Sequence, residues 1–493
     1  MIQEVLMFGA ILIPMIGALI IGVVPIFKDD KKRNICIFIS LVLTLFIVIL
    51  NCLYGDVSVT VLRLSEKLPI LFKKDLMSKW FTMLCSFMWL MVGVFSFEYI
   101  KHEENRNRFY IFYLLTLGAI LGLGFAGNFV TLYLCFEFMT FLSMPLVLHS
   151  GTKEAIQAAK KYLYYSIFGA SLGLLNLFFI SYYSPILEFL PGGVLNNISL
   201  TQNAHTTLLV VSFLSIIGFG AKAGMFPLHA WLPTAHPVAP APASAVLSGV
   251  ITKAGVLCII RTVYYLFGVD FIRGTWVQYA WIILALITVF MGSMLAYNET
   301  IFKKRLAYSS VSQVSYILFG LALLNKIAFT GAMLHMYFHS LIKDVLFLTA
   351  GAIIYLTHKT NVKDFKAMGK RMPIVMWCFT IASLSLIGIP PLSGFISKWY
   401  LCVGSLSLNI QPYAILGPIV LIISALLTAG YLFTITINAF FPGNDFDYNS
   451  LEKIKEPKLM TIPMIILTIL IVLFGLYPHG LLNIINSIVG TIL

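Results

Sequence analysis

Uncharged apolar runs of about twenty residues recur from one end of the chain to the other, and they constrain its fold more than any other feature. A bilayer core about 30 Å thick is crossed by roughly 20 apolar residues in an α-helix. We count about fourteen such runs. Apolar residues make up 59% of the 493 residues and charged residues only 11%. The sequence therefore predicts an all-α membrane protein with about fourteen transmembrane helices.

The predicted spans leave no room for a soluble domain of useful size. They cover residues 4–27, 34–54, 78–100, 109–126, 129–149, 160–183, 206–226, 242–266, 276–297, 305–324, 327–357, 373–405, 412–441 and 460–486. The first span lacks a basic segment before it and a cleavage site after it, so we expect it to be retained rather than removed as a signal peptide. A GxxxG at Gly118 and Gly122 is expected to permit close helix packing.

The net charge of +13 is explained by topology rather than by nucleic acid. If the N-terminus lies outside, the loops that fall inside carry most of the lysines and arginines, beginning with Lys28, Lys31, Lys32 and Arg33. This distribution follows the positive-inside rule with both termini outside. The seven cysteines are scattered without a CxxC pair, so neither an iron–sulfur cluster nor a structural zinc site is expected. We expect a multi-pass protein of the cytoplasmic membrane that has no nucleic-acid partner.

Some cations fall inside the predicted spans. They are Lys222, Lys253, Arg261, Lys343 and Lys398. A charge at the bilayer centre costs at least about 2.5 kcal/mol, so such a residue needs a partner, a wet cavity or a function. Arg261 lies near the end of its span, and we expect it to snorkel toward the surface. The lysines are the informative residues.

Two predicted spans are interrupted by glycine and proline next to a lysine. The seventh places Lys222 before Pro227, and the twelfth places Pro390 and Pro391 before Lys398. Proline removes an amide donor, and backbone opened at membrane depth persists only beside protein or a water-filled cavity. Paired broken helices in the two halves of a chain indicate a transport site between repeats. The alternative is a pair of ordinary proline kinks.

Glu137 lies in the middle of the fifth span with no polar residue near it in the sequence. Its partner must come from another helix, and we expect Lys222. A static buried ion pair is the alternative, but apolar replacement of such a pair is often neutral or stabilising, so stability explains it poorly. Lysine suits proton transfer because its proton affinity responds to burial and to a neighbouring carboxylate. A chain along the membrane midplane is predicted to pass protons through Lys222, Lys253, Lys343 and Lys398.

The eleventh span contains His335, His339 and Lys343 at intervals of four residues, which places them on one face of a helix. Imidazole both donates and accepts hydrogen bonds near neutral pH, so it can relay protons between lysines. A metal site is disfavoured because the motif holds no cysteine or second carboxylate. Asp344 lies about 100° around the helix from Lys343 and is expected to serve a different neighbour.

His229 and His236 lie in the proline-rich stretch after the first break. They are either a loop-side proton entry or solvated loop histidines. The glycines at Gly218 and Gly220 loosely fit a dinucleotide fingerprint, but no strand precedes them. No arrangement of nucleophile and base and no phosphate loop accompanies them, so we expect this chain to bind no cofactor and to catalyse no covalent step.

Four blocks of the sequence, at residues 227–255, 304–313, 335–347 and 388–399, resemble one known family. It comprises the antiporter-like, proton-translocating membrane subunits of respiratory complex I, Mrp-type cation/proton antiporters and membrane-bound nickel–iron hydrogenases. The resemblance implies fourteen helices with two inverted five-helix repeats. The implied divisions are N-terminal helices at 1–108, a first repeat at 109–266, a second at 267–441 and a C-terminal helix at 442–493.

The resemblance also implies roles for matched positions, which are the residues already selected above. Glu137 and Lys222 match the charge pair, and Lys253 matches the bridging lysine. The central histidines match His335 and His339, and the terminal lysine matches Lys398. The chain departs from the family pattern at Thr234, Ile301 and Asp344, where many relatives carry an acid, an aspartate and a small residue.

After the last predicted span, we expect no counterpart of the lateral helix of the largest complex I subunit. The residues around His236 most resemble those of membrane-bound hydrogenase and Mrp D-type subunits. We expect an ion-translocating subunit of a redox-driven complex. It is expected to carry protons, and coupling to sodium stays open. Its expected partners are other membrane subunits and a redox arm. The alternatives are a stand-alone transporter of a small solute and a scaffold that only anchors a redox arm.

Overall fold

The computed structural model describes residues 2–66, 68–184, 186–195, 200–408, 410–443 and 452–493. The fold is nearly all helical, with 79% of the residues in helices. Within the described residues, 12 helices are long and apolar enough to cross a membrane. The predicted all-α membrane fold is confirmed. The count of fourteen spans and the repeat boundaries stay predictions.

The helices of the first half follow the predicted apolar runs closely. They are α1 (Ile2–Val23), α2 (Asp30–Leu53), α3 (Leu76–Tyr99), α4 (Arg106–Gly124), α5 (Phe129–Val147), α6 (Lys153–Tyr183), α7 (Gln202–Ala223) and the short α8 (Leu232–Val238). One continuous helical stretch then passes through α9 (Ala241–Val246), the π-helical η3 (Leu247–Ile251), α10 (Thr252–Ile260) and the π-helical η4 (Arg261–Phe267). Short 3-10 turns lie at η1 (Pro25–Lys28) and η2 (Ile100–His102).

The second half contains the twelfth predicted span as two separate helices. Its elements are α11 (Val269–Ile272), α12 (Trp276–Asn298), α13 (Phe302–Ala322), α14 (Lys326–Thr357), η5 (Val362–Asp364), α15 (Met368–Arg371), α16 (Pro373–Ile387), α17 (Ser393–Leu406), α18 (Tyr413–Phe440), α19 (Lys458–Leu476) and α20 (His479–Ile492). The break between α16 and α17 falls at the predicted prolines.

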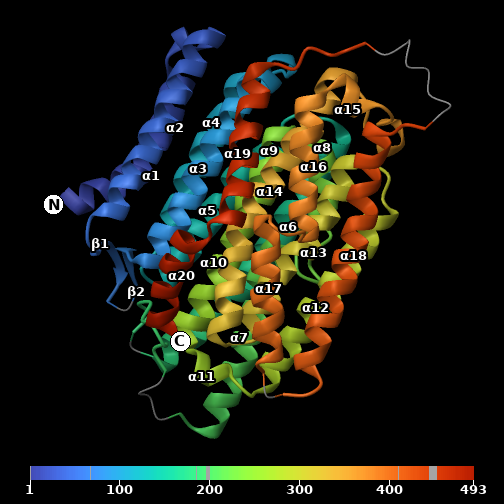
Figure 1. The fold of residues 1–493 in the computed structure, drawn as a ribbon. Coiled ribbons are helices and arrows are strands. Elements are labelled where there is room, and N and C mark those ends of the chain that lie inside the picture. Colours follow the sequence, from blue (N-terminus) through green and yellow to red (C-terminus); the bar gives the residue numbers. More distant parts are fainter. Residues whose placement is uncertain (1, 67, 185, 196–199, 409, 444–451) are drawn as a thin grey trace.

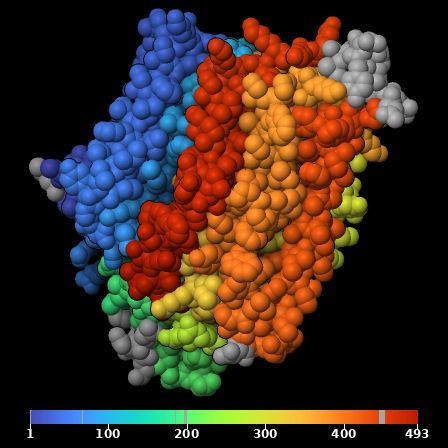
Figure 2. Space-filling model, in the orientation of Figure 1, coloured from blue at the N-terminus to red at the C-terminus, as the bar shows by residue number. Residues whose placement is uncertain are grey.

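Helix α14 occupies the centre of the bundle, where it packs against α3, α13, α16, α17 and α19. Figure 1 shows α19, drawn in red, beside α3, drawn in blue, so the C-terminal part of the chain packs against its first third. Figure 2 shows the same C-terminal helices filling the space between the N-terminal helices and the orange helices α16 to α18. All residues in the most apolar stretch of 241–267 are buried inside the protein, as are 78% of those in the most apolar stretch of α14. The helices that carry Lys253, Lys343 and the two histidines of α14 therefore face protein rather than lipid.

A β-hairpin interrupts the helical fold where only a loop was expected, at residues 55–77. Strands β1 (Val57–Ser65) and β2 (Leu68–Lys74) are antiparallel. Strand β2 also binds the connection between α4 and α5, because Lys73 N donates to Phe125 O at 2.7 Å and Gly127 N donates to Leu71 O at 2.9 Å. The hairpin thereby ties the start of α3 to the connection between α4 and α5.

Glycines allow three pairs of helices to approach closely. A Cβ on Gly118 would lie 2.8 Å from the Ile11 carbonyl oxygen, so the predicted close packing at this motif is confirmed against α1. A Cβ on Gly169 would overlap the carbonyl oxygen of Gly218, which brings α6 against α7. A Cβ on Gly255 would lie 3.0 Å from Cβ of Lys222, so α10 packs directly on the last turn of α7.

Arg261 does not snorkel, and that prediction was wrong. Its side chain is 1% exposed, and its two terminal nitrogens donate to the Asp75 carboxylate at 2.7 and 2.9 Å. Asp75 caps the N-terminus of α3 by accepting from Ser78 N at 2.8 Å. The sequence pattern missed this pair because the partner lies 186 residues away, in the turn after β2. Arg261 is therefore a buried link between η4 and α3.

Candidate functional site

Lys222 lies at the end of α7, where Gly224 adopts a φ of +86° and terminates the helix. The lysine is wholly buried, and its Nζ donates to Thr140 Oγ1 at 2.9 Å, Tyr162 OH at 2.6 Å and Ser166 Oγ at 3.2 Å. An ammonium group has three donors, and these hydroxyls from α5 and α6 satisfy all of them without neutralising its charge. Lys222 is thus held in place while its charge stays available to other groups.

The break after α7 is braced by Trp231. Its Nε1 donates to the Ala221 carbonyl oxygen at 2.7 Å, and its ring centroid lies 4.8 Å from that of Tyr162. Carbonyl groups in the last turn of a helix have no partner within the helix. Trp231 therefore stabilises the open helix end and also positions one of the hydroxyls that bind Lys222.

Glu137 and Lys222 are both described, and no ion pair within 4.0 Å joins them. Glu137 Oε1 accepts from Tyr133 OH at 3.4 Å, and its buried Oε2 has no protein partner. Thr140, which binds Lys222, lies on α5 one turn after Glu137. The two charges interact electrostatically without contact. The expected direct pair is absent, and three hydroxyls occupy the donors of the lysine instead.

The centre of the bundle brings Lys253 to the histidines of α14. Its Nζ lies 2.6 Å from His339 Nδ1 and donates to the Ser248 carbonyl oxygen at 2.5 Å. An ammonium group can only donate, so His339 accepts at Nδ1 when Lys253 is charged and then carries its own proton at Nε2. The rings of His335 and His339 stack with centroids 5.9 Å apart. His335 Nδ1 lies 2.9 Å from Ser397 Oγ, which leads to α17.

Lys398 lies at the second helix break. Its Nζ donates to the carbonyl oxygens of Leu386 at 2.6 Å and Ile387 at 3.0 Å, in the last turn of α16 before Gly388. Cations are favoured there because the carbonyl end of a helix carries partial negative charge. Tyr316 bridges this site to the centre, since its ring lies 5.0 Å from Lys398 Nζ and stacks on His335 at 5.4 Å.

Lys343 turns away from the histidines that share its helix. Its Nζ donates to the Leu306 carbonyl oxygen at 2.9 Å and to Ser309 Oγ, both on α13. The neighbouring Ser310 shares a hydrogen bond of 2.7 Å with Ser248 Oγ, so α13 connects back to the residue that binds Lys253. Lys343 therefore belongs to a branch through serine hydroxyls rather than to the imidazole pair.

Asp344 is wholly buried, and neither carboxylate oxygen has a protein partner. It faces Gly249 in the π-helical η3, where a Cβ would overlap Oδ1. Asp344 also interacts electrostatically with Lys253. Asp344 was expected to interact with a different neighbour from Lys343, and its position beside Gly249 and Lys253 agrees with that expectation. The glycine makes room for a carboxylate beside the central lysine.

His236 is wholly buried, so it is not a solvated loop histidine. Its ring stacks on Phe347 at 4.6 Å, and both ring nitrogens lack a protein partner. His229 is half-buried with an unpartnered Nδ1, and its ring lies 6.0 Å from that of Phe226. The role of either residue in proton entry stays a prediction.

Several buried polar atoms along this path have no protein partner. They are Glu137 Oε2, His236 Nδ1 and Nε2, His335 Nε2, His339 Nε2 and both oxygens of Asp344. Buried polar atoms in folded proteins are nearly always hydrogen-bonded, and ordered water supplies the bond where protein does not. The path between the two helix breaks is therefore polar enough to hold water.

The hydroxyl groups of the site were not found from the sequence. The residues concerned are Thr140, Tyr162, Ser166, Ser248, Ser309, Tyr316 and Ser397. Serine and threonine are common in membrane helices as packing residues, so their presence alone indicates nothing. The four-residue spacing of Tyr162 and Ser166 is the one signal that places two hydroxyls on the same face of α6.

A helical membrane bundle with two broken helices and a line of buried lysines and histidines between them defines a class of protein, the antiporter-like membrane subunits. A family model described as "NADH:quinone oxidoreductase/Mrp antiporter, TM" matches residues 126–428. The chain belongs to this family.

Relatives agree with this assignment. The chain is 31% identical over 413 residues to the N-type subunit of NADH-quinone oxidoreductase from Desulforudis audaxviator, covering 81% of this chain and 80% of the relative. It is 31% identical over 418 residues to the D-type subunit of an Na(+)/H(+) antiporter from Alkalihalophilus pseudofirmus, covering 84% and 83%. A chain of the archaeal membrane-bound sulfane sulfur reductase superimposes with a TM-score of 0.84 at 29% identity, covering 97% of this chain and 77% of that one. Together with the family match, they support an ion-translocating subunit of a multisubunit membrane complex.

Proposed function

We propose that this subunit moves protons through the membrane plane along the buried side chains between its two helix breaks. The path runs through Glu137, Lys222, Lys253, His339, His335 and Lys398, with a branch at Lys343. The observation that carries the proposal is the contact of 2.6 Å between Lys253 Nζ and His339 Nδ1, because it joins two groups that can exchange a proton directly. Both groups are wholly buried.

The imidazole pair supplies the relay. A proton that passes from Lys253 to His339 Nδ1 releases the proton at Nε2 of the same ring. That atom has no protein partner, and neither has His335 Nε2, so water can carry the proton from one ring to the other. From His335 the hydroxyl of Ser397 leads toward Lys398. Each step then needs only small rotations of side chains and water.

Glu137 biases the position of the proton through space. Two unit charges 4 Å apart interact by about 4 kcal/mol at an effective dielectric constant of 20, and the interaction weakens with distance. Glu137 and Lys222 lie beyond that distance, so their coupling is smaller. About 1.4 kcal/mol changes a proton affinity tenfold. Because this coupling is weak, a change of charge in a neighbouring subunit can reverse which group holds the proton. If Glu137 and Lys222 were in direct contact, their stronger coupling would resist that change.

Protons fit this path better than sodium does. Hard cations are bound by clusters of oxygen ligands, whereas the central contacts here are made by lysine and histidine nitrogens. Pumping by this subunit is therefore expected to continue without sodium. The proposed setting is a redox-driven hydrogenase-like or Mrp-type complex in the cytoplasmic membrane, with both termini outside because the basic loops face inward.

A double-mutant cycle on Lys253 and His339 tests the relay. Lys253→Met and His339→Gln are each expected to lower the proton-pumping rate of the assembled complex in proteoliposomes at least about tenfold, which is about 1.4 kcal/mol. The double variant is expected to lose no more than the worse single variant, because both changes interrupt one step. Matched controls are the exposed Lys326→Met and His479→Gln, which are expected to pump normally.

Additive losses in that cycle would show that the two residues act in separate steps and would overturn the relay. If both single variants assembled and pumped protons normally, the buried charges would be dispensable, as expected for a scaffold that only anchors a redox arm. Uptake of a small solute by the purified chain alone would favour the stand-alone transporter.

A further inference from the structure

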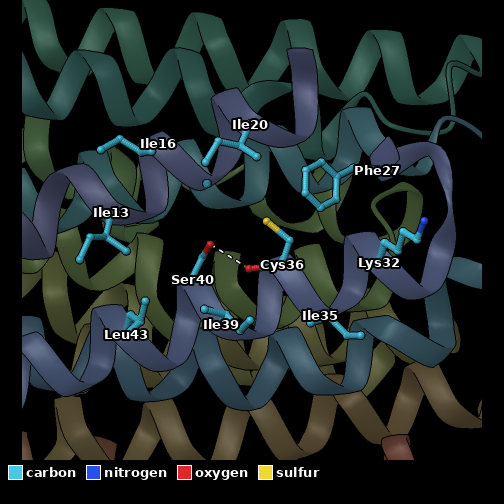
Figure 3. Close-up of a pocket in the computed structure, with 11 residues that line it drawn as sticks. Ile13, Ile16, Ile20, Phe27, Lys32, Ile35, Cys36, Ile39, Ser40 and Leu43 are labelled. Atoms are coloured by element: carbon cyan, nitrogen blue, oxygen red, sulfur yellow. Dashed lines mark hydrogen bonds between the residues drawn. The ribbon is translucent and has the colours of Figure 1, made fainter. Parts of the chain in front are cut away.

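An apolar cavity of about 480 Å³ opens between α1 and α2, at the edge of the bundle. Figure 3 shows isoleucines of both helices around it, with Leu43 and Ile13 near one end and Phe27 and Lys32 near the other. The apolar walls are formed by Ile13, Ile16, Ile20, Ile35, Ile39 and Leu43. We call this cavity the α1–α2 groove. Its walls are suited to hydrocarbon rather than to a polar solute.

The floor of the groove has no polar group in need of a partner. A Cβ on Gly17 would lie 3.1 Å from Ser40 Cβ, so the two helices touch there and close the groove from behind. Ser40 Oγ donates to the Cys36 carbonyl oxygen of its own helix at 2.9 Å. The one donor of this hydroxyl is therefore already occupied. The groove therefore recognises shape and apolar surface.

The length of the groove matches one leaflet of a bilayer. Lys32 and Leu43 are separated on α2 by a helical rise of roughly 16 Å at 1.5 Å per residue. Half of a hydrocarbon core of about 30 Å is about 15 Å. A chain that starts at Lys32 thus ends near the membrane midplane at Leu43, as a single acyl chain of that leaflet does.

The volume argues against a helix of another subunit as the occupant. A helix with a diameter of about 10 Å fills roughly 1,200 Å³ over the same length. The groove holds about 480 Å³, which lies in the range of small-ligand sites of about 300–1,000 Å³. One hydrocarbon chain fits within such a space, whereas a whole helix does not.

Lys32 supplies a charge at the surface end of the groove. Its side chain is exposed and forms no ion pair within the part of the chain that the structure describes, although its backbone N binds Asp29. Lys28 and Lys31 lie in the same region. Basic residues at a membrane surface attract anionic lipid headgroups. We propose that the α1–α2 groove binds one acyl chain of an anionic phospholipid whose phosphate lies on Lys32.

Photo-crosslinking with lipids that carry a diazirine near the end of the acyl chain tests this site in the purified complex. Phosphatidylglycerol is expected to label the groove residues at least about fivefold more than phosphatidylcholine, the effect of one lysine near an anionic headgroup. Lys32→Ala is expected to remove that preference. Lys31→Ala, its exposed neighbour that does not line the groove, is expected to retain it.

A second pair of variants tests the chain rather than the headgroup. Ile39→Trp fills the groove and is expected to abolish labelling by both lipids, whereas Phe38→Trp, on the exposed face beside it, is expected to leave labelling intact. Equal labelling by the two lipids would overturn the proposal. So would an equal effect of Lys31→Ala and Lys32→Ala, or crosslinks from the groove to a helix of a partner subunit.

Discussion

Lys222→Met is expected to reduce proton pumping by the assembled complex at least about tenfold without impairing its assembly. Methionine has a similar length and no charge, so it removes the titratable group and leaves the hydroxyls of Thr140, Tyr162 and Ser166 in place. No carboxylate contacts Lys222, so the change leaves no contacting counter-charge buried without its partner and removes the cost of burying an ammonium group. The account therefore predicts loss of function together with unchanged or raised stability, measured as the initial rate of acidification in proteoliposomes and as thermal unfolding.

Lys326→Met is the matched control, because Lys326 is exposed at the start of α14. It removes the same charge from the same chain and is expected to pump at the normal rate. A Lys222→Met complex that pumps normally would contradict the role of Lys222. A Lys222→Met complex that fails to assemble would instead show that the lysine is needed for packing.

Unlike Lys222→Met, Arg261→Met is expected to destabilise the protein, with a loss in the free energy of unfolding of about 3–5 kcal/mol. This change leaves the Asp75 carboxylate, which is only 18% exposed, without its cation. Removing one partner of a buried pair is costly because the other charge stays buried, whereas Lys222 has no carboxylate in contact to strand. The measurement is thermal or denaturant unfolding of the purified complex.

Arg273→Met is the control for that prediction. Arg273 pairs with Asp270 at 2.8 Å, but both side chains are at least half exposed, at 50% and 80%. Exposed ion pairs contribute about 0–1 kcal/mol, and the further bond from Arg273 to the Leu324 carbonyl oxygen at 3.0 Å adds about 1 kcal/mol, so Arg273→Met is expected to lose much less stability than Arg261→Met. Equal stabilities of the two arginine variants would contradict the structural role given to Arg261.

Much of the fold was predictable because lipid imposes a simple rule. Backbone groups in hydrocarbon must be satisfied within the segment, so long apolar runs become helices with few alternatives. The helix breaks were predictable for a related reason, since Pro227 and the pair Pro390–Pro391 cannot continue a helix. The structure ends α7 and α16 at Gly224 and Gly388, both with positive φ, just before these prolines.

Features that depend on partners distant in the sequence were not predictable. The β-hairpin alternates polar and apolar residues in Val57–Ser65, but that pattern does not reveal that β2 will bind the turn after α4. Arg261 was expected at the surface because its distance from the helix end was visible and its partner Asp75 was not. Glu137 was expected to contact Lys222 because the hydroxyls that compete for the lysine carry no signal in a single sequence.

The central claim is that water joins the Lys222 site to the histidine pair through the middle of the protein. A cryo-electron microscopy map of the assembled complex, at a resolution that shows ordered water, measures this most directly. The account predicts water at Nε2 of His335 and His339 and at both oxygens of Asp344, in a chain that reaches from Lys253 to Lys222. Apolar side chains packed without water between Lys222 and Lys253, in every state of the working complex, would contradict it.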